Sequence, residues 1–233
     1  MNAKSSPLAE IAKAVAALLL PERCRVCRAP SVAALCPDCL TSVVYSDDDG
    51  SRDDDDGFQR AVCQYGQPTA GLIHRLKYAA DRAALPAIAA IVAGRDLSPC
   101  DGADLIIPVP LHSARLRRRG LNQSLILALL FFPERRRDIR CDLLIRHRPT
   151  RPQTGLGGHE RRRNLADAFS LTEKARALIA HKHLLLIDDV RTTGSTLGEC
   201  RRVLLAGGAA RVSCLTFLSA DSRADAPTGE KKA

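Results

Sequence analysis

Three short apolar runs in the second half of the chain, residues 104–111, 183–188 and 210–218, have the length of buried strands. The first run stops at two prolines, which is typical of a strand that ends in a rigid loop. The second run is followed by a loop rich in glycine and threonine. Such runs predict strands in the interior of an α/β fold.

Helical spacing lies between the second and third runs, at Leu197, Cys200, Val203 and Leu204. Gly207 and Gly208 follow this pattern and are expected to end the helix. Residues 183–218 therefore predict a strand–helix–strand unit, which is right-handed almost without exception.

The first half of the chain also shows helical spacing, at Leu72, Ile73 and Leu76 and again over residues 83–92. Residues 12–20 are mostly apolar, but this stretch is too short to cross a membrane and predicts an amphipathic helix. A signal peptide remains an alternative, although no small-residue cleavage site follows the stretch. We expect no membrane span.

These patterns divide the chain into four parts. Residues 7–45 hold the first helix and a cysteine module, and the acid-rich residues 46–57 read as a solvated linker. Residues 58–220 hold the strands and helices of the α/β domain. The polar residues 221–233 are expected to be disordered.

The composition of the 233-residue chain, 45% apolar and 26% charged, is typical of a soluble globular protein. Trp is absent and aromatic residues make up 3%, which argues against a carbohydrate-binding or base-stacking surface. The net charge is +9, and residues 115–163 carry this excess, with 14 arginines against four acidic residues. Solvated helix faces account for part of this charge. The rest favours phosphate groups, either of a small ligand or of nucleic acid.

Nine cysteines, an odd number, predict a reducing compartment such as the cytoplasm, in which thiols bind metal or stay free. Four of them form two pairs, Cys24 with Cys27 and Cys36 with Cys39, separated by eight residues. Four thiolates at this spacing can close around a structural Zn²⁺. Two disulfides are the alternative, and they would require an oxidising compartment.

The most informative string is residues 185–196, in which an apolar run delivers Asp188 and Asp189 to the end of a predicted strand. A loop follows that consists of Val190, Arg191, Thr192, Thr193, Gly194, Ser195 and Thr196. Ligands of open parallel sheets bind at the carboxyl ends of the strands, and a helix N-terminus attracts phosphate. The string therefore predicts a ligand with both hydroxyl and phosphate groups. The alternative is that one aspartate caps the helix and the threonines fill a turn.

This string resembles the signature of the type I phosphoribosyltransferases, an apolar strand, two acids and a Thr-Thr-Gly-x-Thr loop. The resemblance implies a Rossmann-like parallel sheet flanked by helices. It also implies that Asp188 and Asp189 hold the ribose hydroxyls of phosphoribosyl pyrophosphate, while residues 190–196 hold its 5-phosphate.

Further strings are similar to the ComF family of phosphoribosyltransferase-like proteins, which is associated with competence and DNA uptake. They are Leu76-Lys77-Tyr78, the turn at 108–110 with residues 119–124, residues 148–153 with 163–165 and 168–169, and the cysteine pairs. The resemblance covers about residues 21–218.

The family resemblance places the leaving diphosphate at the turn of Val109, Pro110 and Leu111. Three arginines, Arg148, Arg151 and Arg163, flank the glycine-rich residues 155–158, which could close over this group. For Asn122 and Gln123, a hydrogen bond that positions the neighbouring loop and a contact with the ligand remain equal alternatives.

The implied function is binding of phosphoribosyl pyrophosphate with Mg²⁺, followed by transfer of the phosphoribosyl group. In that reaction metal and arginine stabilise the charge of the departing diphosphate. The sequence contains no recognisable nucleobase pocket. A non-catalytic adaptor is therefore the second hypothesis, with weak binding of single-stranded DNA or a DNA-processing protein as its partner.

Overall fold

The computed structural model describes residues 23–46, 55–78, 81–148 and 167–220. The predicted N-terminal helix, most of the acidic linker and the C-terminal tail lie outside these residues, so these predictions remain untested. None of the described helices is long and apolar enough to cross a membrane.

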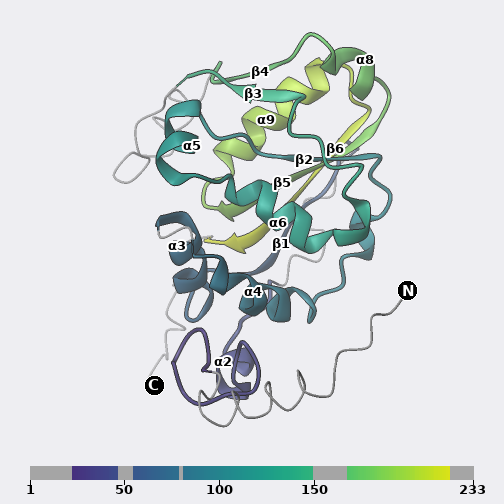
Figure 1. Cartoon of the computed structure of the whole chain (residues 1–233). Coiled ribbons are helices and arrows are strands. Elements are labelled where there is room, and N and C mark those ends of the chain that lie inside the picture. Colours follow the sequence, from purple (N-terminus) through teal and green to yellow (C-terminus); the bar gives the residue numbers. More distant parts are fainter. Residues whose placement is uncertain (1–22, 47–54, 79–80, 149–166, 221–233) are drawn as a thin grey trace, which may run out of the picture.

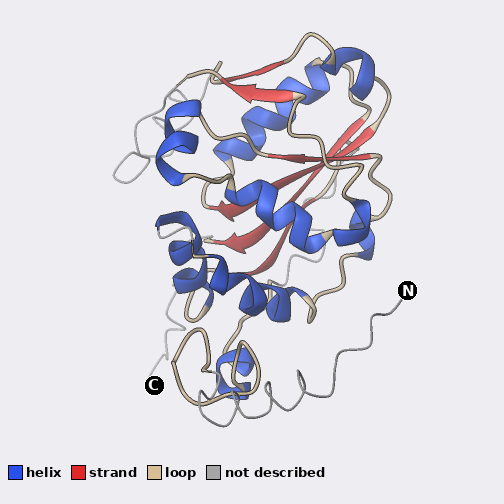
Figure 2. Ribbon diagram, viewed as in Figure 1, coloured by secondary structure: helices blue, strands red, loops and turns tan. Residues whose placement is uncertain are grey.

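A four-stranded parallel sheet lies at the centre of the chain (Figures 1 and 2). Its strands are β1 (Gln59–Gln64), β6 (Arg211–Ser219), β5 (His183–Arg191) and β2 (Leu105–Pro108), in the order β1-β6-β5-β2. The three strands predicted from apolar runs are confirmed as β2, β5 and β6. The α/β class is confirmed as well, with a parallel sheet flanked by helices, whereas the specific phosphoribosyltransferase fold remains a prediction.

Helices cover both faces of this sheet (Figure 1). One face packs against α3 (Thr69–Tyr78), α4 (Leu85–Val92) and α6 (Gln123–Phe131), and its core includes Ile106, Leu185 and Phe217. The other face packs against α9 (Ser195–Ala206) and α8 (Ala175–Ile179), and its core includes Ile107 and Leu186. Neighbouring residues of one strand thus serve opposite faces, which explains the continuous apolar runs.

A small antiparallel pair, β3 (Leu144–Arg146) and β4 (Phe169–Leu171), lies beside α9 and was not predicted. The short helix α5 (Ser113–Arg119) follows β2 and ends at Gly120, whose φ of 72° is the left-handed conformation that glycine adopts without strain. Single turns of 3₁₀-helix occur at Arg82–Ala84, Ser98–Cys100 and Pro133–Arg135.

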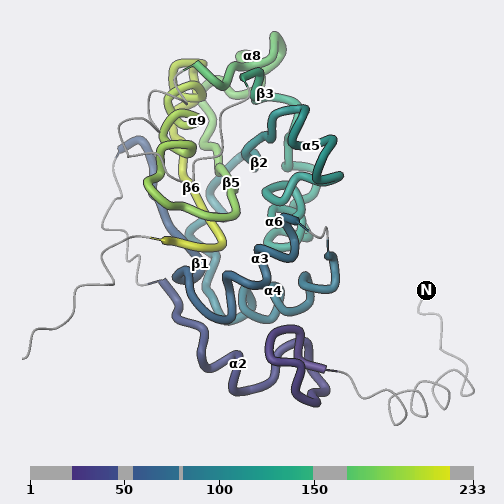
Figure 3. The backbone as a smooth tube through the Cα atoms, turned by 90° about the vertical axis from the view of Figure 1, so that its left-hand side faces the viewer, coloured from purple at the N-terminus to yellow at the C-terminus, as the bar shows by residue number. Residues whose placement is uncertain are grey.

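The cysteine module contains one short helix, α2 (Pro37–Thr41), and lies at the end of the molecule next to α3 and α4 (Figures 1 and 3). Its buried residues Leu35 and Val43 belong to the same apolar cluster as Leu72 and Ile88. Backbone hydrogen bonds join the two parts, from Gln64 N to Val44 O at 2.8 Å and from Ser46 N to Val62 O at 3.2 Å. The module is therefore packed against the α/β unit.

Candidate functional site

A cavity of about 420 Å³ opens at the carboxyl ends of β2 and β5. Asp188, Asp189 and Val190 of β5 line it, as do Thr192 of the following loop and Thr196 in the first turn of α9 (Ser195–Ala206). Helices α3, α5 and α6 and strand β3 supply the remaining walls. This is the edge of a parallel sheet at which ligands are expected to bind.

Asp188 is held in place from two directions. The Ser124 hydroxyl donates to its Oδ1 at 2.9 Å, and the backbone N–H of Asp189 donates to the same oxygen at 2.9 Å. Burial and the negative charge of Asp189 raise the pKa of Asp188 to about 7. The raised pKa allows Asp188 to take up or release a proton near neutral pH.

Asp189 forms an ion pair with Lys77 of α3, with 3.0 Å between Nζ and Oδ2. Both side chains are largely buried, at 21% and 13% exposure. The two carboxylates therefore differ, because Lys77 pairs with Asp189, whereas burial and the charge of Asp189 raise the pKa of Asp188. Lys77 was part of a family string in the sequence, but nothing in its neighbourhood along the chain assigned it to Asp189.

The loop after β5 leads directly into α9. Gly194 precedes the helix with a φ of 72°, and no side chain caps the helix N-terminus. Thr193 and Ser195 hydrogen-bond to each other through their hydroxyls at 2.7 Å. The alternative that an aspartate caps this helix is therefore wrong, although Thr193 does fill a turn, because its Oγ1 accepts from the N–H of Ser195 at 3.5 Å. The next N–H groups of α9, those of Thr196 and Leu197, have no side-chain cap and can meet an anion.

Arg191 is turned away from the other loop residues. Its side chain is buried and donates from Nη2 to Ser219 Oγ at 2.9 Å, at the end of β6. Its guanidinium group thus joins two strands of the sheet. Any contact between Arg191 and a ligand would have to come from the backbone.

The turn after β2 contributes Val109, Pro110 and Leu111 to the cavity wall. Proline has no N–H, and the N–H of Val109 donates to Ile187 O at 2.9 Å. Leu111 is therefore the candidate backbone donor among the three. Asn122 is structural, because its Nδ2 donates to Val109 O at 3.2 Å and its Oδ1 caps α6 at Ser124 N.

Four arginines line the cavity, namely Arg115, Arg118 and Arg119 of α5 and Arg146 of β3. Burial lowers the pKa of Arg115 and Arg146. Of the three arginines predicted to meet a diphosphate, Arg148 is exposed and is not part of the cavity wall. Arg151 and Arg163 lie outside the described residues. Charge counting along the sequence pointed to this segment, but it could not select the residues that face the site.

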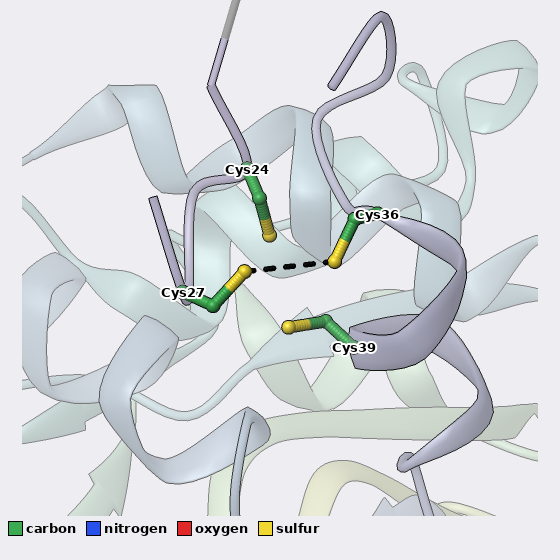
Figure 4. Close-up of side chains that lie close together, drawn as sticks. All are labelled: Cys24, Cys27, Cys36 and Cys39. Atoms are coloured by element: carbon green, nitrogen blue, oxygen red, sulfur yellow. Dashed lines mark hydrogen bonds between the residues drawn. The ribbon is translucent and has the colours of Figure 1, made fainter. Parts of the chain in front are cut away.

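The four paired cysteines lie around one centre (Figure 4). Their sulfur atoms all lie within 4.8 Å of one another, and Cys27 Sγ and Cys36 Sγ are 3.6 Å apart. A tetrahedral Zn²⁺ with Zn–S bonds of about 2.3 Å would separate its sulfurs by about 3.8 Å. Burial and the neighbouring thiols raise the pKa of Cys39 to about 12, so a cation is needed to ionise all four. The arrangement fits a structural zinc site, with no disulfide among the described cysteines.

The cysteine module also contacts the helix that carries Lys77. Arg75 of α3 donates from Nη1 to the backbone O of Arg25, which lies between Cys24 and Cys27. The same guanidinium group binds Asp81, with 2.9 Å between Nε and Oδ2. One helix thus touches both the cysteine cluster and the paired aspartates.

Comparison with known proteins finds relatives that cover most of the chain. DNA utilization protein YhgH of Escherichia coli O157:H7 is 33% identical over 204 residues, which are 81% of this chain and 86% of that protein. The protein of the same name from Salmonella typhimurium is 34% identical over 157 residues, 65% of this chain and 67% of that protein. Competence protein F of Haemophilus influenzae is 40% identical over 103 residues, 43% of this chain and 44% of that protein. No protein-family model matches the chain.

Proposed function

The chain belongs to the ComF family, and on this premise we propose that it binds phosphoribosyl pyrophosphate and takes part in the use of incoming DNA. Of the three relatives described above, two are named for DNA utilization and one for competence. The observation that carries the ligand is the pairing, in one cavity, of two carboxylates with the open N-terminus of α9.

In this proposal Asp188 and Asp189 accept hydrogen bonds from the ribose hydroxyls. Thr192, Thr196 and the first N–H groups of α9 hold the 5-phosphate, aided by the positive end of the helix dipole. The cations of α5 and β3 lie on other walls of the same cavity and are suited to the diphosphate.

Mg²⁺ would neutralise part of the diphosphate charge when the ligand is bound. Among the described residues, the four cysteines form the one group that could hold a metal ion by itself. The magnesium ion would therefore enter with its diphosphate. The chain's own contribution to transfer is to orient the sugar and to stabilise the departing charge with arginines, without a covalent nucleophile.

A second candidate is the binding of single-stranded DNA. One observation favours it, since Arg117 and Arg118 of α5 are exposed close to the cavity and continue its positive charge outward. Phosphate contacts of this kind supply affinity without reading the base sequence. An adaptor that holds a DNA strand could use this helix whether or not transfer occurs.

We also propose that Cys24, Cys27, Cys36 and Cys39 bind one Zn²⁺ per chain. The zinc would replace a hydrophobic core in a module too small to build a large one. Elemental analysis of protein purified without added metal should find about one zinc per chain. Less than half an equivalent, with the four thiols oxidised in pairs, would favour two disulfides instead.

A thermal-shift measurement tests the ligand site. Phosphoribosyl pyrophosphate with Mg²⁺ should raise the melting temperature, because a ligand that binds only the folded state stabilises it. Asp189→Asn combined with Thr192→Val should abolish the shift, because both residues line the cavity, whereas the exposed control Asp101→Asn should keep it. An unchanged shift in the double variant would remove the proposed site.

Salt dependence separates ligand binding from DNA binding. Replacing Arg117, Arg118 and Arg119 together would not distinguish the two kinds of binding, because Arg118 and Arg119 line the cavity. Arg117→Ser is the better variant, since this exposed side chain is not part of the cavity wall. If α5 holds DNA, this change should remove one phosphate contact and make the slope of log affinity against log salt shallower by about one. The thermal shift produced by phosphoribosyl pyrophosphate should stay intact. DNA binding that is tight at physiological salt, with no shift by phosphoribosyl pyrophosphate, would exclude the transferase function.

A further inference from the structure

A second cavity, of about 310 Å³, lies away from the paired aspartates. It opens beside the amino-terminal half of β1, whereas the first cavity lies at the carboxyl ends of β2 and β5. Its walls come from β1, from Leu215 of β6 and from the segment that follows α4. The two cavities share no lining residue. Its volume is near the lower end of known ligand pockets, which suits a small molecule.

The floor of the second cavity is apolar and buried. Ala61, Cys100 and Leu215 are 1%, 2% and 3% exposed. Cys100 and Leu215 belong to the apolar cluster that packs against α4. Burial raises the pKa of the Cys100 thiol to about 12, so the floor carries no charge at neutral pH. Such a floor offers contact area to a hydrocarbon group.

Two arginines reach the rim of this cavity from different parts of the chain. The guanidinium carbon of Arg60 lies 5.1 Å from the centroid of the buried Phe58 ring, which restrains the Arg60 side chain. Arg95 follows α4, and its backbone N–H donates to Val92 O at 2.9 Å. Among the described residues, Arg95 has no ion-pair partner. The rim thus presents positive charge that can bind an anionic group.

One acid, Asp96, shares the rim with these two cations. Its Oδ1 accepts from the Ser98 N–H and its Oδ2 from the Ser98 hydroxyl, both at 2.9 Å. These hydrogen bonds and the charges of Arg60 and Arg95 lower the pKa of Asp96, so the group is ionised at neutral pH. A carboxylate has about four acceptor sites, so Asp96 can accept from a further donor.

We propose that the second cavity binds a free α-amino acid with an apolar side chain. The carboxylate of the amino acid would accept hydrogen bonds from Arg95 and Arg60, and its ammonium group would donate to Asp96. Its side chain would lie on the apolar floor, where it is removed from water. Both signs of charge and an apolar floor in one small cavity match the three parts of such a molecule.

The mixed charge of the rim suits an amino acid better than a simpler ligand. A phosphate dianion would be repelled by Asp96 and would leave the apolar floor unused. A carboxylate without an amino group would meet the same repulsion. A hydrocarbon would cover the charged groups of the rim without giving them a partner. An amino acid offers a partner to each sign of charge.

Isothermal titration with L-leucine and its two halves measures this match. Isocaproate has the carboxylate and side chain of leucine without the amino group, and isopentylamine has the amine without the carboxylate. We expect L-leucine to bind at least about 10-fold more tightly than either half, which is the factor that one hydrogen bond to a charged group supplies.

Two variants assign the ends of the ligand. Arg95→Gln should weaken both L-leucine and isocaproate by about 10-fold, and it should not weaken isopentylamine. Asp96→Asn should weaken L-leucine but strengthen isocaproate, because it removes a like charge and keeps an oxygen for the Ser98 N–H. Arg137→Gln is the control, since this exposed arginine does not line the cavity. The melting temperature of each variant shows whether the fold is retained.

Several results would overturn the amino-acid site. A Kd for L-leucine weaker than about 10 mM would do so, as would equal affinities for leucine and isocaproate. Inorganic phosphate that binds more tightly than leucine, and loses its affinity in Arg95→Gln, would make the cavity an anion site instead. The thermal shift by phosphoribosyl pyrophosphate should persist in all three variants, because none of these residues lines the first cavity. Its absence from the wild type would contradict the proposed function and leave the amino-acid site standing.

Discussion

Asp188 should destabilise the folded chain above neutral pH, and its replacement should reveal this. The group lies in a cavity wall with its pKa raised from the usual 3.8 to about 7 by burial and by Asp189. In the unfolded chain the same carboxyl ionises near its usual value. Folding at pH 8 therefore transfers a charge from water into a poorly hydrated place beside another acid. Asp188→Asn removes this charge and keeps an oxygen that Ser124 and the Asp189 N–H can reach.

The sign of the effect follows from the raised pKa. The contribution of Asp188 to stability is fully present below pH 3.8 and is lost as the pH rises through about 7. At about 1.4 kcal/mol per unit, the whole loss is on the order of 4 kcal/mol, and about 2–3 kcal/mol of it falls between pH 5 and pH 8. Asp188→Asn should therefore be stabilising relative to wild type, and more so at pH 8 than at pH 5 by roughly that difference.

Urea unfolding of both chains at the two pH values measures this difference. Asp142→Asn is a control of opposite sign, because Arg140 and Lys174 bind Asp142 and hold its pKa well below the usual value. That variant should be less stable than wild type at pH 8. Asp188→Asn should also lose the thermal shift with phosphoribosyl pyrophosphate. If Asp188→Asn is instead equally destabilised at both pH values, the aspartate is a structural residue and the reasoning from its buried charge is refuted.

Three further changes test how the two parts of the chain are joined. A strong zinc chelator should lower the melting temperature and also the shift produced by phosphoribosyl pyrophosphate, with released zinc measured by a colorimetric reagent. Arg75→Met should keep the zinc content but reduce that shift, because it removes the bond between α3 and the backbone of Arg25. Gly94→Ala should cost about 1–3 kcal/mol in urea unfolding, because its methyl group would overlap the Tyr45 hydroxyl, and Tyr45→Phe in the same chain should recover part of this loss.

Much of the sheet could be predicted because its central strands are buried on both faces. Strand β5 contains the apolar run 184–187, every residue of β6 after Arg211 is buried, and the helix between the two strands shows regular spacing. The edge strand β1 reads Gln-Arg-Ala-Val-Cys-Gln, and its three central residues alone are buried, so its pattern is too short to identify. Strands β3 and β4 have three residues each and depend on each other for hydrogen bonds. Local patterns carry little information about such short elements.

The candidate site also has one part that the sequence predicts and another that only the fold reveals. Asp188, Asp189 and the loop before α9 are contiguous in the sequence, so their chemistry could be recognised together. Lys77 and Arg146 reach the cavity from elements that lie about 111 and 42 residues before Asp188 along the chain, and only the folded sheet brings them to it. The cysteine cluster could be predicted without the fold, because two close pairs of cysteines along the chain are typical of a tetrahedral metal site.

Helix α3 gives a physical reason for joining the cysteine module to this cavity. Leu72, Ile73 and Leu76 fix the helix in the apolar cluster that also contains the buried cysteines. Arg75 and Lys77 are two residues apart, which is a rotation of about 200° around the helix axis, so they point to nearly opposite sides. One side is bound to the backbone of Arg25, between Cys24 and Cys27 of the proposed zinc site, and the other to Asp189. Loss of the proposed zinc would free the first contact, and the rigid helix would pass this loss to Asp189, the carboxylate proposed to hold the ribose.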